Sequence, residues 1–304
     1  MTSSFDEDRI VVDSPTEQRN PRTLHIDEVD TAGVIGLLLA EEATVPDAVA
    51  RQAGAIAAAA DLMVASIRAG GRVHYVGAGT SGRLCVLDAA ELGPTYSVGS
   101  EWVDAHMAGG PSALVHAAEN SEDDAGAAER DLDDVAPGDT VVGVAASGRT
   151  PYVAGALSLA RRRGAHAVLV SSNPRAELAG LADVAILVDT GPEAITGSTR
   201  MKAATAQKIV LNTLSTTAMV RLGRTYSNLM VCVRATNGKL RGRLLNLLVQ
   251  ATGCSDAACD EALRLAGGQL PVALVMLLAG VDAASARSAL GGSVGVREAL
   301  AALG

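Results

Sequence analysis

Residues 72–83, RVHYVGAGTSGR, decide the fold of this chain. Residues 72–76 form a short β-like run, which ends directly in a glycine loop at residues 77–83. Apolar residues resume after Arg83 with helical spacing, so the stretch predicts strand, loop and helix in that order. A helix that begins at such a loop points backbone N–H groups and the positive end of its dipole outward, and this favours a bound phosphate. The predicted phosphate contacts are Gly79, Thr80 and Ser81.

The same pattern recurs further along the chain. Residues 140–144 predict a second strand, and a loop follows it before a helix over residues 153–163. This loop adds the candidate phosphate contacts Ser147, Gly148, Arg149 and Thr150. Two such loops at the carboxyl edge of one sheet can surround a single phosphate.

Alternating strands and helices predict an α/β fold with a doubly wound, mainly parallel sheet covered on both faces. Further strands are predicted at residues 167–170 and 184–188, with a weaker candidate at 96–103. Helices are predicted at residues 31–40, at 46–68 and from Ser198 to Leu222. After residue 240 strand signals stop and glycines separate short helical segments. We therefore divide the chain into an N-terminal arm and helix (1–45), a central phosphate-binding α/β domain (46–239) and a small helical C-terminal domain (240–304).

Composition excludes several classes of protein. The formal charge of −9 argues against a nucleic-acid partner, which needs a basic face. The polar N-terminus lacks the features of a signal peptide, and the longest apolar run, residues 270–279, is too short to span a membrane. The four cysteines form no C-x-x-C pair and the five histidines show no metal-ligand spacing. We expect a cytoplasmic protein with no metal, no cofactor and no membrane partner.

The first glycine loop leaves other interpretations open. Gly77, Gly79 and Gly82 match G-x-G-x-x-G, and Glu101 lies about where a ribose contact would lie, so a dinucleotide site competes. The hydroxyl-rich sequence and the second loop favour a monophosphate. Both loops could also be ordinary tight turns between strand and helix.

Acidic residues and a polar helix start complete the candidates. Asp88 and Glu91 follow the first loop, and Glu119, Glu122, Asp123 and Asp124 form a second acidic cluster. A carboxylate near a phosphosugar can serve as general acid or base, although most acidic clusters are solvated surface. The segment PEAITGSTRMKAATAQK, residues 192–208, is either a helix capped by Ser198 or Thr199, or a further anion or sugar contact. Its candidate binding residues are Ser198, Thr199 and Lys202.

Ordered motifs along nearly the whole chain resemble the N-acetylmuramic acid 6-phosphate etherases, which are built on the sugar isomerase (SIS) fold. The matching stretches are TEQRN (16–20), GAGTSGRL (77–84), LDA (87–89) with Glu91, ED (122–123), VGVAASGRTPYV (142–153), GSTRMKA (197–203), TAQK (205–208) and ATGC (251–254). Cys85, Gly93 and Ala204 depart from the usual residues, and none of these changes removes a carboxylate or a loop hydroxyl.

The resemblance implies cleavage of the ether between D-lactate and carbon 3 of N-acetylmuramic acid 6-phosphate, by elimination and then addition of water. It places the acid and base roles on Glu91 and Glu122. We assign Glu91 as the acid at the lactate oxygen and Glu122 as the base. It also implies a homodimer, and the 16–20 motif is expected to fold over a site, in its own subunit or the partner.

Three alternatives remain at this point. A phosphosugar isomerase on the same fold needs similar loops but no means of expelling lactate. A non-catalytic phosphosugar sensor, like the glucokinase regulatory protein that the chain also resembles, needs neither carboxylate. A dinucleotide-binding oxidoreductase is the most distant.

Overall fold

The computed structural model describes residues 13–116, 118, 120–233 and 238–304. By their contacts these residues divide into two compact units. The first contains residues up to Asp88 together with 103–214, and the second contains 89–102 together with 215–304. The three-domain division predicted above remains a prediction.

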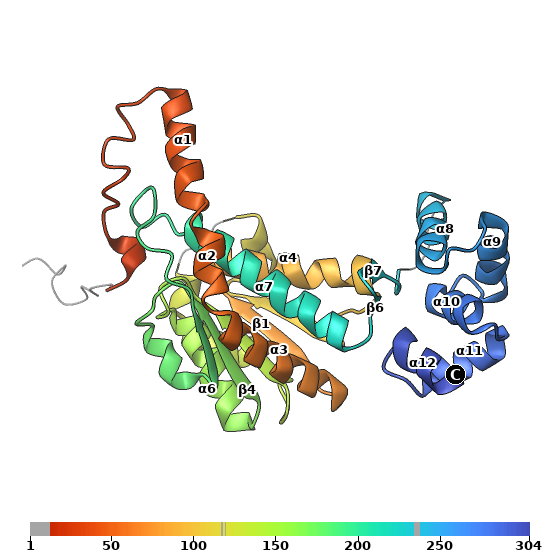
Figure 1. The fold of residues 1–304 in the computed structure, drawn as a ribbon. Coiled ribbons are helices and arrows are strands. Elements are labelled where there is room, and N and C mark those ends of the chain that lie inside the picture. The colour runs from red at the N-terminus through yellow and green to blue at the C-terminus, as the bar shows by residue number, and fades with distance from the viewer. Residues whose placement is uncertain (1–12, 117, 119, 234–237) are drawn as a thin grey trace, which may run out of the picture. The chain divides into compact units, whose positions relative to one another are not determined.

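The first unit is built on a five-stranded parallel sheet, coloured orange to green in Figure 1. The strand order is β2-β1-β3-β4-β5, and every neighbouring pair is parallel. The strands are β1 (Val73–Gly77), β2 (Val103–Met107), β3 (Thr140–Val144), β4 (His166–Ser171) and β5 (Val184–Leu187). This confirms the predicted fold class and four of the five predicted strand positions. The weak candidate at 96–103 is wrong, because the preceding helix continues to Tyr96 and the strand begins only at Val103.

Helices cover both faces of the sheet. On one face lies α3, joined to β3 by a hydrogen bond between Ser66 Oγ and Thr140 Oγ1 at 2.8 Å. The opposite face packs against α5 and α6, and Gly143 of β3 leaves the room that Val153 of α6 fills. The first unit contains helices α1 (Thr31–Glu42), α2 (Val45–Ala50), α3 (Ala53–Arg68), α5 (Ala125–Asp131) and α6 (Pro151–Arg163). The helices α4 (Gly79–Tyr96) and α7 (Lys202–Arg221) begin in the first unit and end in the second. Short 3-10 turns are η1 (Pro15–Glu17), η2 (Pro111–Leu114), η3 (Ser121–Asp123) and η4 (Glu177–Leu181).

The second unit contains a helical bundle, shown in blue in Figure 1, and a two-stranded hairpin. Its helix α10 contacts the other four helices of the bundle and carries much of the core. Its elements are β6 (Thr225–Tyr226), β7 (Leu229–Met230), α8 (Gly238–Thr252), α9 (Asp256–Leu265), α10 (Leu270–Ala279), α11 (Ala283–Gly291) and α12 (Val296–Leu303). The helix breaks fall at the predicted glycines, and Gly253 and Gly280 have positive φ angles of 70° and 66°, which glycine adopts readily. Among the described residues, no single helix is both long and apolar enough to cross a membrane.

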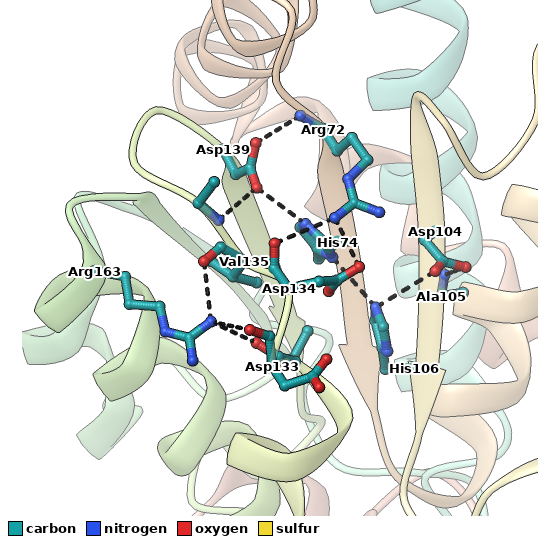
Figure 2. A network of polar contacts seen from close by, with 12 residues as sticks. Arg72, His74, Asp104, Ala105, His106, Asp133, Asp134, Val135, Asp139 and Arg163 are labelled. Atoms are coloured by element: carbon teal, nitrogen blue, oxygen red, sulfur yellow. Dashed lines mark hydrogen bonds and ion pairs between the residues drawn. The ribbon is translucent and has the colours of Figure 1, made fainter.

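A buried polar network joins β1, β2 and the start of β3 (Figure 2). His74 is fully buried, and its Nε2 lies 3.3 Å from Asp139 Oδ2. Its Nδ1 lies 3.2 Å from His106 Nε2, with the two rings stacked. Asp139 also accepts hydrogen bonds from the backbone N–H groups of Arg72 and Ala136. Burial first, and then the neighbouring His106, lower the pKa of His74 despite the attraction of Asp139.

This network predicts a loss of stability in mild acid. Because His74 has a pKa below its usual 6.5 when folded, the unfolded chain binds more protons, and stability falls as the pH drops below 6.5. One such group contributes at most about 1.4 kcal/mol per pH unit. We expect His74→Asn to remove most of this slope in urea unfolding between pH 7 and pH 5.5. The exposed His25→Asn serves as the control, and an unchanged slope in His74→Asn would contradict the assignment.

Candidate functional site

The sheet topology predicts a ligand position at the carboxyl ends of β1 and β3. From β1 the chain crosses to β2 on one side, whereas β3 lies on the other side of β1. In doubly wound sheets with this 2-1-3-4-5 order, the connections leave in opposite directions between the first and third strands and open a ligand crevice there. The two predicted loops follow these two strands.

The first loop is shorter than the sequence suggests. β1 ends at Gly77 and α4 begins at Gly79, so the residues predicted as loop already form the first turn of the helix. A Cβ on Gly77 would lie 2.8 Å from Gly82 N, and one on Gly82 would lie 2.7 Å from Gly77 O. Only glycine permits this close approach. Consequently the N-terminus of α4, with Gly79 and the half-buried Thr80, lies directly at the carboxyl end of β1.

Ser81 is also at this helix start, but it contacts α7. Its Oγ donates a hydrogen bond to Gln207 Oε1 at 2.9 Å, and both residues are buried. Gln207 Nε2 has no hydrogen-bond partner among the described residues. Thus the first loop and α7 share a polar contact, and one buried donor of that contact has no partner among the described residues.

The second loop lies between β3 and α6, which begins at Pro151, two residues before the predicted start, because proline suits the first turn of a helix. Gly148 has a φ of +68°, and a Cβ there would lie 2.2 Å from Ala176 Cβ. Ser147 O accepts a hydrogen bond from Asn173 Nδ2 at 3.1 Å. Arg149 forms an ion pair with Glu177 at 2.5 Å. Thr150 occupies the position before α6. The loop is therefore held against the segment that follows β4.

The segment 192–208 differs from its prediction in how its helix is capped. Ser198 and Thr199 lie in a turn before α7, which begins only at Lys202, so neither caps the helix. The carboxylate of Glu193 takes that place and accepts hydrogen bonds from the N–H groups of Lys202 and Ala203, at 3.0 and 2.9 Å. Burial of Glu193 raises its pKa against these two bonds. The N–H groups at this helix start are therefore already occupied by a side-chain carboxyl group.

Lys202 belongs to a buried ion-pair cluster. Its Nζ lies 2.8 Å from Glu41 Oε2, and both residues are at most 2% exposed. Arg22 makes two further bonds to the same carboxylate, at 2.5 and 2.7 Å. The hydrogen bond from Arg22, and then that from Lys202, lower the pKa of Glu41 to about 2 although burial opposes this. In the structure, therefore, the Lys202 ammonium joins the end of α1 to the start of α7.

The two predicted catalytic carboxylates lie on different elements. Glu122 is exposed on η3, which contacts α6, the helix that follows the second loop. The same turn places Ser121 close to Gly109, just beyond the end of β2. Glu91 is exposed on α4, in the part of that helix that belongs to the second unit. Glu122 and both candidate loops thus belong to the first unit, whereas Glu91 belongs to the second.

The other acidic residues have structural partners or lie outside the description. Asp88 is buried and accepts a hydrogen bond from Asn212 at 2.5 Å. Asp124 caps α5 through Ala127 N and pairs with Arg130. Glu119 lies outside the described residues. Asp88 and Asp124 therefore each have a structural role in the described chain.

Several polar residues at this edge were not predicted as site residues. Buried hydroxyls of Ser172, after β4, and Thr190, after β5, have no hydrogen-bond partner among the described residues. Such atoms are usually satisfied by a ligand or an ordered water. The only signal in the sequence was their position just after an apolar strand, which Ser172 shares with Asn173. The partners of Glu41, Arg22 and Lys202, lie on other segments, so its role could not be read from local sequence. Glu193 and its partners Lys202 and Ala203 share the segment 192–208, but a fold-back over nine residues has no recognisable pattern.

A cavity of about 320 Å³ lies elsewhere, along the edge strand β2. It is lined mainly by apolar residues, with His106 and Asp131 among them. None of the candidate phosphate residues lines it. Within the described chain, no three His, Cys, Asp or Glu side chains gather closely enough to hold a metal ion.

Comparison with known proteins identifies the fold of the first unit. The model of the glucokinase regulatory protein N-terminal SIS domain matches residues 55–161, and the SIS domain model matches residues 117–217. A putative phosphosugar isomerase involved in capsule formation from Bacteroides fragilis aligns with a TM-score of 0.50 at 23% identity, covering 63% of this chain and 91% of its own. That likeness shows the fold.

The N-acetylmuramic acid 6-phosphate etherase of Thermobifida fusca is 56% identical over 268 residues, 88% of either chain. This chain belongs to the N-acetylmuramic acid 6-phosphate etherase family. The etherase of Serratia proteamaculans is 49% identical over 90% of this chain and 93% of its own. The etherase of Rhizobium rhizogenes is 46% identical over 94% of both. The etherase family resemblance stated from the motifs is confirmed.

Proposed function

We propose that this protein is a carbon–oxygen lyase that cleaves the lactyl ether of N-acetylmuramic acid 6-phosphate in cell-wall sugar catabolism. The observation that carries the proposal is the 56% identity to an etherase over most of both chains. The fold alone would not suffice, because one fold serves many reactions. The crevice between the two phosphate loops supports a phosphosugar as the substrate class.

The phosphate of the substrate binds between the starts of α4 and α6. Gly79 and Thr80 supply contacts from the first loop, and Ser147, Gly148 and Thr150 supply them from the second. Two helix N-termini then face one dianion, and the third is closed by Glu193. Ser172, Thr190 and Gln207 offer uncharged polar groups suited to sugar hydroxyls. Ser198 and Thr199 remain candidates for the same part of the substrate.

The chemistry needs one base and one acid. In the ring-opened sugar the aldehyde at carbon 1 acidifies the proton on carbon 2, and Glu122 removes it. The bond between carbon 3 and the ether oxygen then breaks, and Glu91 protonates that oxygen because lactate is a poor leaving group as an alkoxide. Water adds to carbon 3 of the double bond and a proton returns to carbon 2. The products are N-acetylglucosamine 6-phosphate and D-lactate.

The finer aspects of the proposal concern the setting of the enzyme. We propose a cytoplasmic homodimer that needs neither nucleic acid nor membrane as a partner. The net charge of −9 supports the absence of a nucleic-acid role. Sedimentation of the purified chain measures the dimer directly.

Incubation with N-acetylmuramic acid 6-phosphate in deuterated water tests the reaction. We expect release of D-lactate and a sugar product with deuterium at carbon 2, because the proton returned there comes from solvent. Enzymatic assay of lactate and mass spectrometry of the sugar give the two readouts. Lactate release without deuterium would contradict the elimination, since direct displacement at carbon 3 leaves the carbon 2 proton in place.

A phosphosugar sensor is the second candidate, because the regulatory-protein model matches residues 55–161. A sensor would bind the phosphosugar and release no lactate. The same incubation separates the two functions when binding is measured in parallel by calorimetry.

A further inference from the structure

The N-terminal arm, residues 13–23, docks on loops of its own chain at the carboxyl edge of the sheet. Thr16 O accepts a hydrogen bond from Gly197 N at 3.0 Å. Asn20 Nδ2 donates to Pro192 O at 3.2 Å, and Thr23 Oγ1 donates to Ala194 O at 2.8 Å. Thr16, Asn20 and Thr23 are buried. The arm is therefore part of the folded first unit and lies across the loops that follow β4 and β5.

One side chain joins this arm to the second phosphate loop. Asn173 is fully buried, and its Nδ2 donates to Ser147 O and to Asp13 O, each at 3.1 Å. Its Oδ1 accepts the backbone N–H of Arg175 at 2.9 Å. Both hydrogens of the amide are thus used, one on the loop and one on the arm. A carboxylate of the same shape could make neither bond.

The surrounding contacts make this bridge stiff. Ser171 Oγ donates to Ala146 O, and Asn173 N donates to Ser171 Oγ. Leu178 N donates to Gly148 O on the far side of the loop. On the arm side, Arg175 makes two bonds to the Asp13 carboxylate, at 3.1 and 2.8 Å. A shift of the arm at Asp13 therefore reaches Ser147 through the Asn173 amide.

We propose that Asn173 is a positioning residue that links docking of the N-terminal arm to phosphate binding at the second loop. This inference rests on the proposed function, because it takes the loop at Ser147 as the phosphate site. Asn173 itself does not touch the phosphate. It holds the loop in its binding shape when the arm is docked. By thermodynamic linkage, a bound phosphate then favours docking of the arm by the same factor by which the docked arm strengthens phosphate binding.

The test measures phosphate affinity and arm docking in the full-length protein. Titration calorimetry gives the dissociation constant for inorganic phosphate at fixed ionic strength. The rate of trypsin cleavage after Arg19 and Arg22 measures how firmly the arm is docked, because both residues lie within it. In the unaltered protein we expect saturating phosphate to slow cleavage at these sites about fivefold. This is the change in an equilibrium constant that corresponds to the net free energy of one hydrogen bond. Asn173→Asp should weaken phosphate binding by about the same factor and abolish the protection.

A second variant leaves Asn173 and the loop intact. Asp13→Arg places two cations together and lifts the arm, whereas Asp27→Arg makes the same charge change at an exposed residue of the neighbouring segment. We expect Asp13→Arg to weaken phosphate binding several-fold in the unaltered background and not at all in Asn173→Asp. Asp27→Arg should leave the affinity unchanged.

Several results would overturn the link. One is a folded Asn173→Asp variant that keeps both its phosphate affinity and its phosphate-dependent protection from trypsin. Another is an Asp13→Arg change that weakens phosphate binding equally in the unaltered protein and in Asn173→Asp. If Asn173→Asp failed to fold, Asp13→Arg alone would decide, and an unchanged phosphate affinity would reject the proposal. Phosphate-dependent protection without any lactate release would uphold the link and contradict the proposed reaction.

Discussion

Replacing Glu91 by glutamine is expected to lower lactate release by about a thousandfold or more, because an amide cannot protonate the departing lactate oxygen. General acid and base groups contribute about 10²–10⁴-fold each to such reactions. Binding of N-acetylglucosamine 6-phosphate should change little, since the phosphate loops do not contain this residue. Steady-state lactate assays and calorimetry of the product give both quantities. Glu129→Gln removes a charge from an exposed glutamate of α5 and is the matched control.

The comparison with Glu122→Gln separates the two roles. If Glu122 is the base, Glu91→Gln still exchanges the carbon 2 proton of unreacted substrate with deuterated solvent, although lactate is not expelled. Glu122→Gln should lose both exchange and release. Exchange that survives in Glu122→Gln and disappears in Glu91→Gln would reverse the assignment. Full activity in Glu91→Gln would show that Glu91 has no part in the mechanism.

Replacing Lys202 by methionine is expected to lower the free energy of unfolding by about 3–5 kcal/mol. The change leaves the buried Glu41 carboxylate with Arg22 as its remaining cation, and breaking a buried pair from one side costs about this much. Urea unfolding at pH 7 measures the loss. The double variant Glu41→Gln with Lys202→Met removes both charges and should recover part of it. A loss below about 1 kcal/mol in Lys202→Met would contradict the importance of this pair.

The same cluster has a defined response to acid. The pKa of Glu41 falls from 4.5 in the unfolded chain to about 2 in the fold. Its contribution to stability is therefore complete above pH 4.5 and is lost as the pH falls toward 2. This window lies below the one set by His74, so the two effects can be measured separately on one protein.

The sequence predicted the parallel sheet and its two loops because their signals are local. Short, mainly apolar runs mark β1, β3, β4 and β5 directly. β2 lacks this signal, since Asp104 and His106 interrupt its apolar pattern. It lies at the sheet edge and tolerates polar residues whose partners, including His74, come from another strand.

Helix boundaries were less predictable for a similar reason. The stretch 46–68 has continuous helical spacing, yet it forms α2 and α3 with a break at Arg51 and Gln52. The start of α7 was placed at Ser198 because Ser and Thr are the usual capping residues. In the structure Glu193, nine positions before Lys202, folds back to bond the first N–H groups. Such long-range contacts are set by packing and leave no periodic trace in the sequence.

The Glu193 carboxylate also has a consequence for how a substrate can be oriented. The proposed substrate is an anion at two places, its phosphate and its lactyl carboxylate. A crevice with three equivalent helix N-termini would accept such a molecule in more than one direction. Because the Glu193 carboxylate already accepts the first N–H groups of α7, an anionic group of the substrate is expected to bind there less well than at the starts of α4 and α6. We therefore expect the occupied helix start to favour one orientation of the substrate, through a residue that need not contact it.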